Sequence, residues 1–408
     1  MRLGGRCVVV GVAGGIAAYK AADIVRLLVQ REASVRVVMT RGAQAFVTPL
    51  TFQTLSGAPV STATFDLTQE SEIGHIRLAD EAHLVIAAPA TANLLGKLAA
   101  GIADDLLTTV LTATRAPVLL APAMNVHMYG NRIVQDNLQR LRGVGYHVIG
   151  PGEGALACGY TGLGRMSEPA LIVEEAERLL SPHDLEGERM LVTAGPNREA
   201  LDPVRFLSNR STGRMGYAVA AAARRRGAEV TLVTGPTALP EPTGVAVVRV
   251  DSAREMQRAV RAAYPRVTTV VMTAAVADYR PAEASAEKIR KGSGPMTLRL
   301  VRNPDILAGL GERKGGRLLV GFAAETGDVE ARALHKMHAK NLDLIVANDV
   351  SAPDSGFAVE TNRVQLIDRT GRREQLPLLS KEDVADHICE WIAAHRLARR
   401  SVRGGRRR

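Results

Sequence analysis

A long connection in the middle of the chain reads Thr193-Ala-Gly-Pro-Asn-Arg-Glu-Ala-Leu-Asp-Pro-Val-Arg-Phe-Leu-Ser-Asn-Arg-Ser-Thr-Gly-Arg-Met-Gly216. It follows an apolar run, Met190–Ala194, that predicts a strand, and it precedes Tyr217-Ala-Val-Ala-Ala-Ala-Ala, which predicts the start of a helix. Its glycine, serine and threonine residues can place backbone N–H groups and a helix N-terminus around an anion. The connection is far longer than an ordinary turn, which indicates a functional loop.

The chain on either side of this loop predicts two α/β domains. Short apolar runs alternate with helical patterns in both halves, which is typical of a parallel sheet with helices on both faces. In the first half the predicted strands are Cys7–Val12, Val35–Met39, Leu84–Ala88, Val118–Ala121 and His147–Ile149. In the second half they are Met190–Ala194, Val230–Thr234, Val245–Val250, Thr269–Ala274, Leu318–Ala323 and Leu342–Ala347, followed by a β pair over Ala358–Ile367 and a helix from Lys381 to Ala394.

The segment Ser181–Arg189 interrupts this pattern. We therefore expect a first domain over residues 1–180, a linker over 181–189, a second domain over 190–395 and a disordered tail over 396–408. Seven arginines lie in the tail, so residues 1–395 carry a net charge of only +3 out of the total of +10. Such a tail could bind nucleic acid or another polyanion, but a solvated chain end is the simpler interpretation.

The composition narrows the class of protein. Aromatic residues make up only 3 %, which argues against platforms for base stacking, and we expect no nucleic acid as partner. No apolar run approaches the roughly 20 residues of a membrane helix, and the N-terminus does not predict a signal peptide. Cys7, Cys158 and Cys389 are too few and too far apart for a disulfide framework or a zinc site, so we expect a reducing cytoplasm.

The first candidate site follows the first predicted strand, in the loop Gly11-Val-Ala-Gly-Gly-Ile-Ala-Ala-Tyr-Lys20. Its glycine spacing differs from the dinucleotide fingerprint. The second strand also ends in Met39-Thr40, where an NAD site would have a carboxylate for the ribose. The loop indicates either a mononucleotide such as FMN or simply a tight turn from strand to helix.

Polar residues also follow the next predicted strands. Thr91 and Asn93 lie just after Leu84–Ala88, and Asn125 lies after Val118–Ala121, at the edge where ligands gather in open α/β sheets. Asp104 and Asp105 are either an acid pair or, more simply, helix caps. His75 lies in a loop or at a helix start, where a lone histidine is usually structural or solvated.

The first half resembles the flavoprotein family of cysteine decarboxylases in the order of its motifs. These are Gly-Gly-Ile-Ala-Ala-Tyr-Lys20, Gly74-His-Ile, Pro-Ala-Thr-Ala-Asn93, Ala-Asp-Asp-Leu-Leu107, Pro-Ala-Met-Asn125 and a substrate clamp over Gly154–Met166. The resemblance implies a flavodoxin-like domain with His75 as the base, Asn125 on the substrate and Cys158 as a late proton donor. It implies FMN bound by Gly14, Gly15, Ile16, Thr40, Thr91 and Asn93. A buried apolar role is the alternative for Cys158.

The second half contains a pair of lysines and a pair of histidines. Lys336 and Lys340 would share one helix face, which suits a triphosphate or is merely a solvated surface. His335 and His338 lack an evident third ligand for a metal site, so the metal ligands stay unknown.

This half resembles phosphopantothenate–cysteine ligase through eight ordered motifs. They are Thr-Ala-Gly-Pro196, Asp202-Pro-Val-Arg-Phe with Ser208-Asn-Arg-Ser, Ala-Ala-Val-Ala-Asp278-Tyr-Arg-Pro, Lys288-Ile-Arg-Lys, Asn303-Pro-Asp-Ile-Leu, Gly321-Phe-Ala-Ala-Glu-Thr and Lys340-Asn-Leu-Asp-Leu-Ile-Val-Ala-Asn-Asp-Val. The resemblance implies a Rossmann-like ligase domain that uses CTP and Mg²⁺, with Arg205 and Asn209 on the acyl-cytidylate intermediate and Lys288 as a catalytic residue. The implied CTP site comprises Met272, Thr273, Ala274, Asp278, Lys288, Pro304, Asp305, Ile306, Leu307, Phe322, Lys336 and Lys340.

Together the two resemblances cover roughly residues 6–391 and imply the bacterial bifunctional enzyme of coenzyme A biosynthesis. We expect ligation of cysteine to 4′-phosphopantothenate, then decarboxylation to 4′-phosphopantetheine, by a homo-oligomer with trimeric decarboxylase and dimeric ligase contacts. Arg214 stands where the family usually has lysine, and Asn197 where it has threonine, so ligase rate or affinity is expected to differ. The alternatives are one active half with the other as scaffold, a nucleic-acid-binding protein that uses the tail, and a flavoenzyme for another thiol or aromatic acid.

Overall fold

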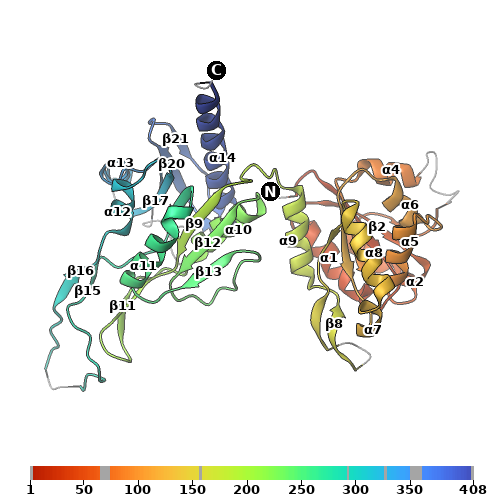
Figure 1. Cartoon of the computed structure of the whole chain (residues 1–408), viewed down its shortest axis with the longest axis horizontal. Coiled ribbons are helices and arrows are strands. Elements are labelled where there is room, and N and C mark those ends of the chain that lie inside the picture. The colour runs from red at the N-terminus through yellow and green to blue at the C-terminus, as the bar shows by residue number, and fades with distance from the viewer. Residues whose placement is uncertain are drawn as a thin grey trace. The chain divides into compact units, whose positions relative to one another are not determined.

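The computed structural model describes residues 3–64, 74–155, 159–291, 294–325, 329–349 and 361–405. The chain divides into two compact units, Met1–Ser181 and Pro182–Arg408 (Figure 1). Each unit is a parallel sheet with helices on both faces. Because both faces of such sheets are buried, their strands are continuous apolar runs, as the sequence shows.

The first unit contains a six-stranded parallel sheet in the order β3-β2-β1-β4-β5-β6. Its strands are β1 (Cys7–Val12), β2 (Ser34–Met39), β3 (Val60–Ser61), β4 (Leu84–Ala90), β5 (Val118–Pro122) and β6 (His147–Val148). Without the two-residue β3, which the sequence analysis did not predict, the order is the flavodoxin order 2-1-3-4-5. The predicted flavodoxin-like fold is therefore confirmed.

Two apolar layers cover this sheet. On one face lie α1 (Ala18–Gln30), α3 (Pro49–Ser56) and α9 (Pro169–Leu180). On the other lie α4 (Gly74–Glu81), α5 (Ala92–Ala100), α6 (Leu106–Ala113) and α8 (Arg132–Gly143). Two one-turn helices, α2 (Arg41–Gln44) and α7 (Val126–Tyr129), and an antiparallel hairpin of β7 (Gly152–Ala155) and β8 (Thr161–Arg165) follow the strand ends.

The second unit contains an eight-stranded sheet in the order β13-β12-β9-β14-β17-β18-β20-β21. The strands are β9 (Arg189–Ala194), β12 (Glu229–Thr234), β13 (Ala246–Arg249), β14 (Thr269–Met272), β17 (Leu318–Glu325), β18 (Leu344–Asp349), β20 (Val364–Asp368) and β21 (Arg373–Gln375). The first six are parallel in the 3-2-1-4-5-6 order of the Rossmann fold, and β20 and β21 are antiparallel. The predicted Rossmann-like class is confirmed.

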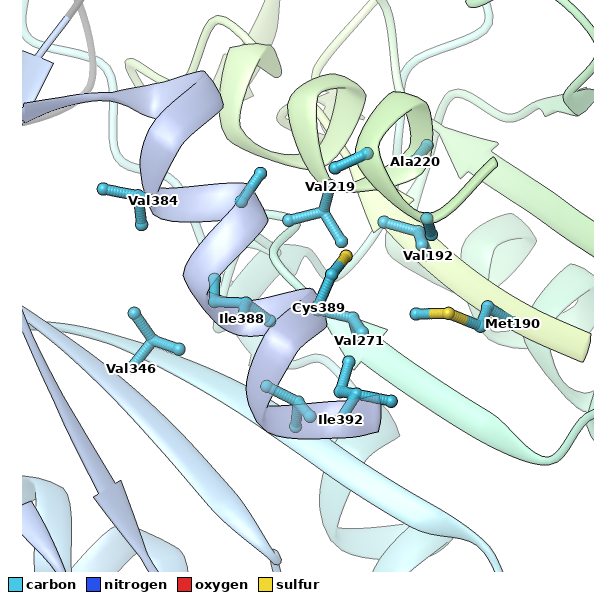
Figure 2. Close-up of a cluster of buried hydrophobic side chains, with 14 of the residues drawn as sticks. Met190, Val192, Val219, Ala220, Val271, Val346, Val384, Ile388, Cys389 and Ile392 are labelled. Atoms are coloured by element: carbon cyan, nitrogen blue, oxygen red, sulfur yellow. The ribbon is translucent and has the colours of Figure 1, made fainter. Parts of the chain in front are cut away.

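Helices cover both faces of this sheet as well. The helices α10 (Arg214–Arg225) and α14 (Lys381–Gly405) lie on one face, and α11 (Ala253–Ala263), η1 (Tyr264–Arg266), α12 (Ile306–Glu312) and α13 (Val329–Ala339) on the other. Figure 2 shows Cys389 of α14 between Val219 of α10 and the sheet residues Val192 and Val271. Full burial raises the pKa of Cys389 to about 12, so this thiol serves as an apolar core group.

Three small antiparallel pairs flank the large sheet. They are β10 (Arg198–Ala200) with β11 (Phe206–Ser208), β15 (Tyr279–Pro281) with β16 (Leu300–Arg302), and β19 (Thr361–Asn362) with β22 (Leu379–Ser380). The first pair lies inside the long connection between β9 and α10.

The structure adds to or differs from the predicted organisation in three places, and residues 358–360 of the predicted β pair lie outside the described residues. The β pair over Ala358–Ile367 does not form among the described residues, because β20 pairs with β18 and β21 and buries Val364 and Leu366 in the core. The predicted linker is packed on the second unit, since Leu185 is 0 % exposed.

The predicted end of the last helix was also wrong. Helix α14 continues to Gly405, so residues 396–405 are helical and not a disordered tail. Arg396 Nε lies 3.0 Å from Glu188 Oε2, and this ion pair anchors the helix beyond Ala394. The arginine, leucine and alanine that follow also favour helix. No described helix, α14 included, has enough consecutive apolar residues to span a bilayer.

Replacing Gly216 by valine should destabilise the second unit. A Cβ at this position would lie 2.5 Å from Ala194 Cβ, 2.6 Å from Thr273 Oγ1 and 2.7 Å from Thr193 O, so α10 would have to move off the sheet. We expect a loss of about 1–3 kcal/mol, measured by chemical unfolding. The control is Gly309→Ala, where a Cβ has nothing within 4 Å and should be neutral or slightly stabilising. Equal stability of Gly216→Val and wild type would contradict this packing.

Two candidate active sites

A cavity of about 980 Å³ lies in the first unit, where β1, β2, β4 and β5 end. It is at the carboxyl edge of the sheet and spans β1 and β4, between which the strand order reverses. Every residue that the sequence analysis assigned to the flavin lines it, and so does the predicted substrate residue: Gly14, Gly15, Ile16, Thr40, Thr91, Asn93 and Asn125. The structure thus brings together seven residues that are up to 111 positions apart in the chain.

Three of these polar residues also cap the helix that follows their strand. Thr40 Oγ1 accepts a hydrogen bond from the Ala43 N–H at 3.2 Å, and Thr91 Oγ1 accepts one from the Leu94 N–H at 3.3 Å. Asn125 Oδ1 accepts one from the His127 N–H at 2.8 Å. The caps fix the path of each loop past the cavity, and the positive end of α5 after Thr91 favours a negative group there.

Close backbone contact explains the glycine at position 14. A Cβ there would lie 2.7 Å from the carbonyl carbon of Gly42, so only glycine lets these two cavity loops touch. Lys20 and Arg165 also line the cavity, and both pair with Glu168, at 3.1 Å and 2.8 Å. The first loop is thereby tied to the β7–β8 hairpin.

Asp104 and Asp105 act as helix-flanking groups, as the simpler interpretation held. Asp105 caps α6 by accepting from the Thr108 N–H at 2.8 Å. Asp104 accepts a hydrogen bond from Lys97 Nζ at 2.7 Å, and this bond raises the pKa of Lys97. Lys97 and Asp105 both line the cavity, and their opposite charges offset each other because Lys97 Nζ lies 3.5 Å from Asp105 Oδ2.

The predicted substrate clamp borders the same cavity. Ala155, Gly164, Arg165 and Met166 line it, and Gly164 O accepts from the Met124 N–H at 3.0 Å. Cys158 lies outside the described residues. The strands before and after Cys158 in the sequence, β7 and β8, therefore both contribute residues to the cavity wall.

His75 lies outside this cavity. It is the second residue of α4, which packs against α6, and it is not among the residues that line the cavity. Its Nδ1 is buried and has no hydrogen-bond partner in the part of the chain that the structure describes. The base predicted for the first site is thus not assembled with it within one chain.

The second site lies where β9 and β14 end, the point of strand-order reversal in the second sheet. Thr273 Oγ1 donates to Thr193 O at 2.6 Å, and the Ala274 N–H donates to Thr193 Oγ1 at 3.2 Å. Asn209 Nδ2 donates to Ala275 O at 2.9 Å, which holds the long connection against the end of β14. Predicted residues of the intermediate site and of the nucleotide site are therefore adjacent.

Asp202 and Arg205 join the same connection to the segment that contains Lys288. Asp202 accepts from the N–H groups of Val204, Arg205 and Ile289, at 2.7 Å, 2.8 Å and 3.1 Å. Arg205 donates to Ile289 O at 2.7 Å. Burial alone would raise the pKa of Asp202, but these donors and Arg205 hold it below its usual range. Arg205 is thus bonded to the backbone of the residue that follows Lys288.

The remaining nucleotide residues divide between two places. Thr273 and Phe322 line a small pocket of about 60 Å³ at the N-terminus of α10. Lys336 and Lys340 line a shallow surface depression on α13, and Lys340 Nζ pairs with Asp305, the cap of α12, at 2.8 Å. Burial raises the pKa of Asp305, but the hydrogen bonds from Lys340 and the Ala308 N–H, together with the charges of Lys340 and Lys336, hold it below its usual range. Lys340 is therefore engaged by Asp305, which the lysine spacing did not indicate.

The other residues predicted to bind the nucleotide line neither pocket, but they lie in segments around this edge of the sheet. Asp278 and Pro304 are brought together because the Asn303 N–H donates to Asp278 O at 2.7 Å. Ile306 and Leu307 are the first two residues of α12, and both are buried. Met272 ends β14, and Ala274 follows it.

Two features of this edge were missed by sequence reasoning. Asn348, Asn362 and Lys381 line the small pocket, and a cavity of about 1020 Å³ beside it is lined by Arg198, Arg214 and Arg249. These residues come from six different strands and helices, so no single spacing in the sequence brings them together. Among the described residues, no three His, Cys, Asp or Glu side chains gather as a metal site.

The comparisons with known proteins agree with this division of the chain. The family described as "Flavoprotein" matches residues 2–181, and the family described as "DNA/pantothenate metabolism flavoprotein C-terminal domain" matches residues 185–395. The chain is thus a flavoprotein domain joined to a pantothenate-metabolism domain.

Relatives are similar over the whole length. The coenzyme A biosynthesis bifunctional protein CoaBC of Bacillus subtilis (strain 168) is 52 % identical over 396 residues, which are 96 % of this chain and 98 % of that protein. The protein of the same name from Escherichia coli (strain K12) is 49 % identical over 397 residues, with the same coverage. A crystal structure of the C-terminal domain of such a protein, 45 % identical, covers 52 % of this chain and 97 % of its own with a TM-score of 0.46. The chain belongs to the family of coenzyme A biosynthesis bifunctional proteins.

Replacing Gly14 by valine should abolish flavin binding. The new side chain would push the first loop away from Gly42, because the Cβ alone would approach a backbone atom to 2.7 Å. We expect the purified protein to lose its yellow colour, measured as flavin absorbance per chain. Gly143→Ala, at a position with nothing within 4 Å of the added Cβ, should keep the flavin. Full flavin content in Gly14→Val would show that the cavity does not hold this group.

Proposed function

We propose that this protein catalyses two consecutive steps of coenzyme A biosynthesis. The second unit ligates cysteine to 4′-phosphopantothenate with CTP, through an acyl-cytidylate. The first unit then decarboxylates phosphopantothenoylcysteine to 4′-phosphopantetheine with FMN. The strongest support is the similarity of 49–52 % identity over 96 % of the chain to bifunctional proteins of this pathway.

The site in the second unit suits activation of a carboxylate. A carboxylate resists attack by an amine, so CMP is first transferred to it and becomes the leaving group. Asn209, held beside the end of β14, and Arg205, bonded to Ile289 O, would orient the acyl-cytidylate. Lys288, next to Ile289 in the sequence, would neutralise phosphate charge as pyrophosphate departs. Thr273, Phe322 and the α10 N-terminus would hold the nucleotide.

The cavity in the first unit fits a flavin mononucleotide in size and chemistry. It has room for a cofactor, and its rim combines exposed apolar side chains, Ile16, Tyr19 and Met128, with the polar caps Thr40 and Thr91. Bound FMN would supply oxidation of the cysteinyl CH₂–SH to a thioaldehyde and the later return of a hydride. Asn125 would bind the substrate, and Cys158 would donate the proton that completes the product.

Decarboxylation follows from this redox change. The thioaldehyde lies two bonds from the carboxylate and accepts the electron pair as CO₂ leaves, which gives an enethiolate. Hydride and proton then restore the thiol, so no external oxidant is consumed. The position of His75 outside the cavity, together with the exposed apolar rim, supports a site completed by a second copy of the chain. Trimeric decarboxylase and dimeric ligase contacts belong to this proposal.

Mg²⁺ and a cytoplasmic location also belong to the proposal. Mg²⁺ usually binds nucleotide phosphates and keeps several waters, so it needs few protein ligands. This agrees with the lack of a three-ligand group among the residues that the structure covers.

A single assay tests both steps. Purified protein receives 4′-phosphopantothenate, cysteine, Mg²⁺ and CTP while pyrophosphate and CO₂ are followed and the flavin spectrum is recorded. We expect both products from a yellow protein. Pyrophosphate without CO₂ would reject the decarboxylase half of the proposal, and the absence of both products would reject the whole.

Two substitutions should separate the steps. Asn209→Asp is expected to abolish pyrophosphate release, because a negative charge would face the acyl phosphate, while decarboxylation of supplied phosphopantothenoylcysteine continues. His75→Ala should do the reverse. Each variant is the control for the other, and a step that survives its own substitution removes that residue from the mechanism.

A further inference from the structure

The cavity of the first unit has a cationic wall residue to which no role has been assigned, Arg41. It follows Thr40, the residue that caps α2 at the end of β2, and it is exposed at the cavity. Within the part of the chain that the structure describes, no hydrogen bond or ion pair engages its side chain. An unpaired arginine is ordinary on an open surface, but Arg41 lines a cavity that fits an anionic cofactor.

The other cations of this wall are offset by carboxylates. Among the described lining residues these cations are Lys20, Lys97 and Arg165. Lys20 and Arg165 share Glu168, at 3.1 Å and 2.8 Å. Lys97 contacts two carboxylates, Asp104 at 2.7 Å and Asp105 at 3.5 Å. Three carboxylates thus offset these three cations, and Arg41 remains as the positive charge in excess.

The backbone around Arg41 places it beside the loop that follows β1. Its neighbour in the sequence, Gly42, touches Gly14, because a Cβ on Gly14 would lie 2.7 Å from the Gly42 carbonyl carbon. Gly14 belongs to the loop after β1, which is where doubly wound folds bind the phosphate of a nucleotide. Arg41 therefore borders the loop at which a bound nucleotide would have its phosphate.

The far side of the cavity is built from other strands. Thr91 follows β4 and Asn125 follows β5, whereas Arg41 follows β2. In the sheet order, β1 and β4 lie between β2 and β5. With a spacing of about 4.8 Å between neighbouring strands, roughly 14 Å separate the two sides. An elongated cofactor with a phosphate at one end and a flavin ring at the other suits this separation.

We propose that Arg41 binds a phosphate monoester in the cavity of the first unit and supplies the positive charge that this anion requires. This inference rests on the proposed FMN-dependent function. Two phosphate monoesters take part in that reaction, FMN itself and the 4′-phosphate of phosphopantothenoylcysteine, and a guanidinium group recognises both with the same paired N–H donors. The position of Arg41 beside the loop after β1 favours the phosphate of the flavin.

The first test compares two flavins that differ only in the phosphate. Full-length wild type, Arg41→Gln and Arg41→Lys are freed of flavin and titrated with FMN and with riboflavin, which lacks the phosphate, and the quenching of flavin fluorescence gives each Kd. Arg41→Gln should raise the Kd for FMN about 10- to 100-fold, the effect of losing a charge-assisted hydrogen bond, and leave the Kd for riboflavin unchanged. Arg41→Lys should recover part of the loss, because lysine keeps the charge but not the paired donors.

The riboflavin titration separates phosphate binding from a structural role. If Arg41 only supported the loop after β2, its substitution would weaken the binding of FMN and riboflavin by the same factor, and this result would overturn the proposal. Arg140→Gln is the matched control, since Arg140 is an exposed arginine of α8 that does not line the cavity. It should bind both flavins as the wild type does.

A second measurement identifies the source of the phosphate. Release of CO₂ is followed at saturating FMN with phosphopantothenoylcysteine and with pantothenoylcysteine, which lacks the phosphate. A raised Kd of Arg41→Gln for FMN with wild-type KM values assigns the flavin phosphate to Arg41. A raised KM for the phosphorylated substrate alone, with unchanged FMN binding, assigns the substrate phosphate instead. An unchanged Kd for FMN together with unchanged KM values for both substrates overturns the proposal.

Failure of this inference can be told apart from failure of the proposed function. A wild type that neither binds FMN nor releases CO₂ would reject the FMN-dependent decarboxylase itself. A wild type that does both, beside an Arg41→Gln variant with the same constants, would reject only the role of Arg41. Pyrophosphate release by the second unit should be equal in all variants, which checks that the preparations are intact.

Discussion

Burial of both faces of two parallel sheets is the constraint on which the rest of this molecule depends. Helices on each side leave the strands no exposed face, so side chains such as Val9, Val10, Val270 and Val271 are buried in alternate layers. Polar chemistry is confined to the carboxyl edges, where the strands end in loops and helix starts. Both sites lie at these edges, beside the strand pair at which the order reverses.

The fold could be predicted because apolar runs and strands coincide so closely. The run Cys7–Val12 matches β1 without error, and the central strands of both sheets differ from their predicted bounds by only a few residues. The failures lie where tertiary contacts override local sequence. The segment 181–189 has the composition of a linker, yet Leu185 is buried, and the ion pair of Arg396 with Glu188 holds a helical turn that the arginine-rich sequence did not suggest.

The candidate sites were predicted unevenly for a related physical reason. Residues that follow strands in the first unit meet in one cavity, because parallel strands deliver their carboxyl ends to one edge. In the second unit the same rule predicts that Thr273, Ala274 and Asn209 lie close together. It does not predict which side chains α14 and β19 contribute to the site. Lys381 lines the pocket because α14 packs on the sheet, and Asn362 lines it because β19 pairs with β22 over two residues. Neither contact produces a periodic pattern in the sequence.

The unusual arginine at position 214 makes sense in this arrangement of charges. Arg214 lines both the small pocket and the larger arginine-lined cavity beside it, so a long planar cation at this point borders two spaces at once. A lysine there would present one compact charge to the small pocket only. In this protein a second cationic residue, Lys381 on a different helix, also lines the small pocket. The departure at Arg214 therefore keeps a positive charge at the border of both spaces.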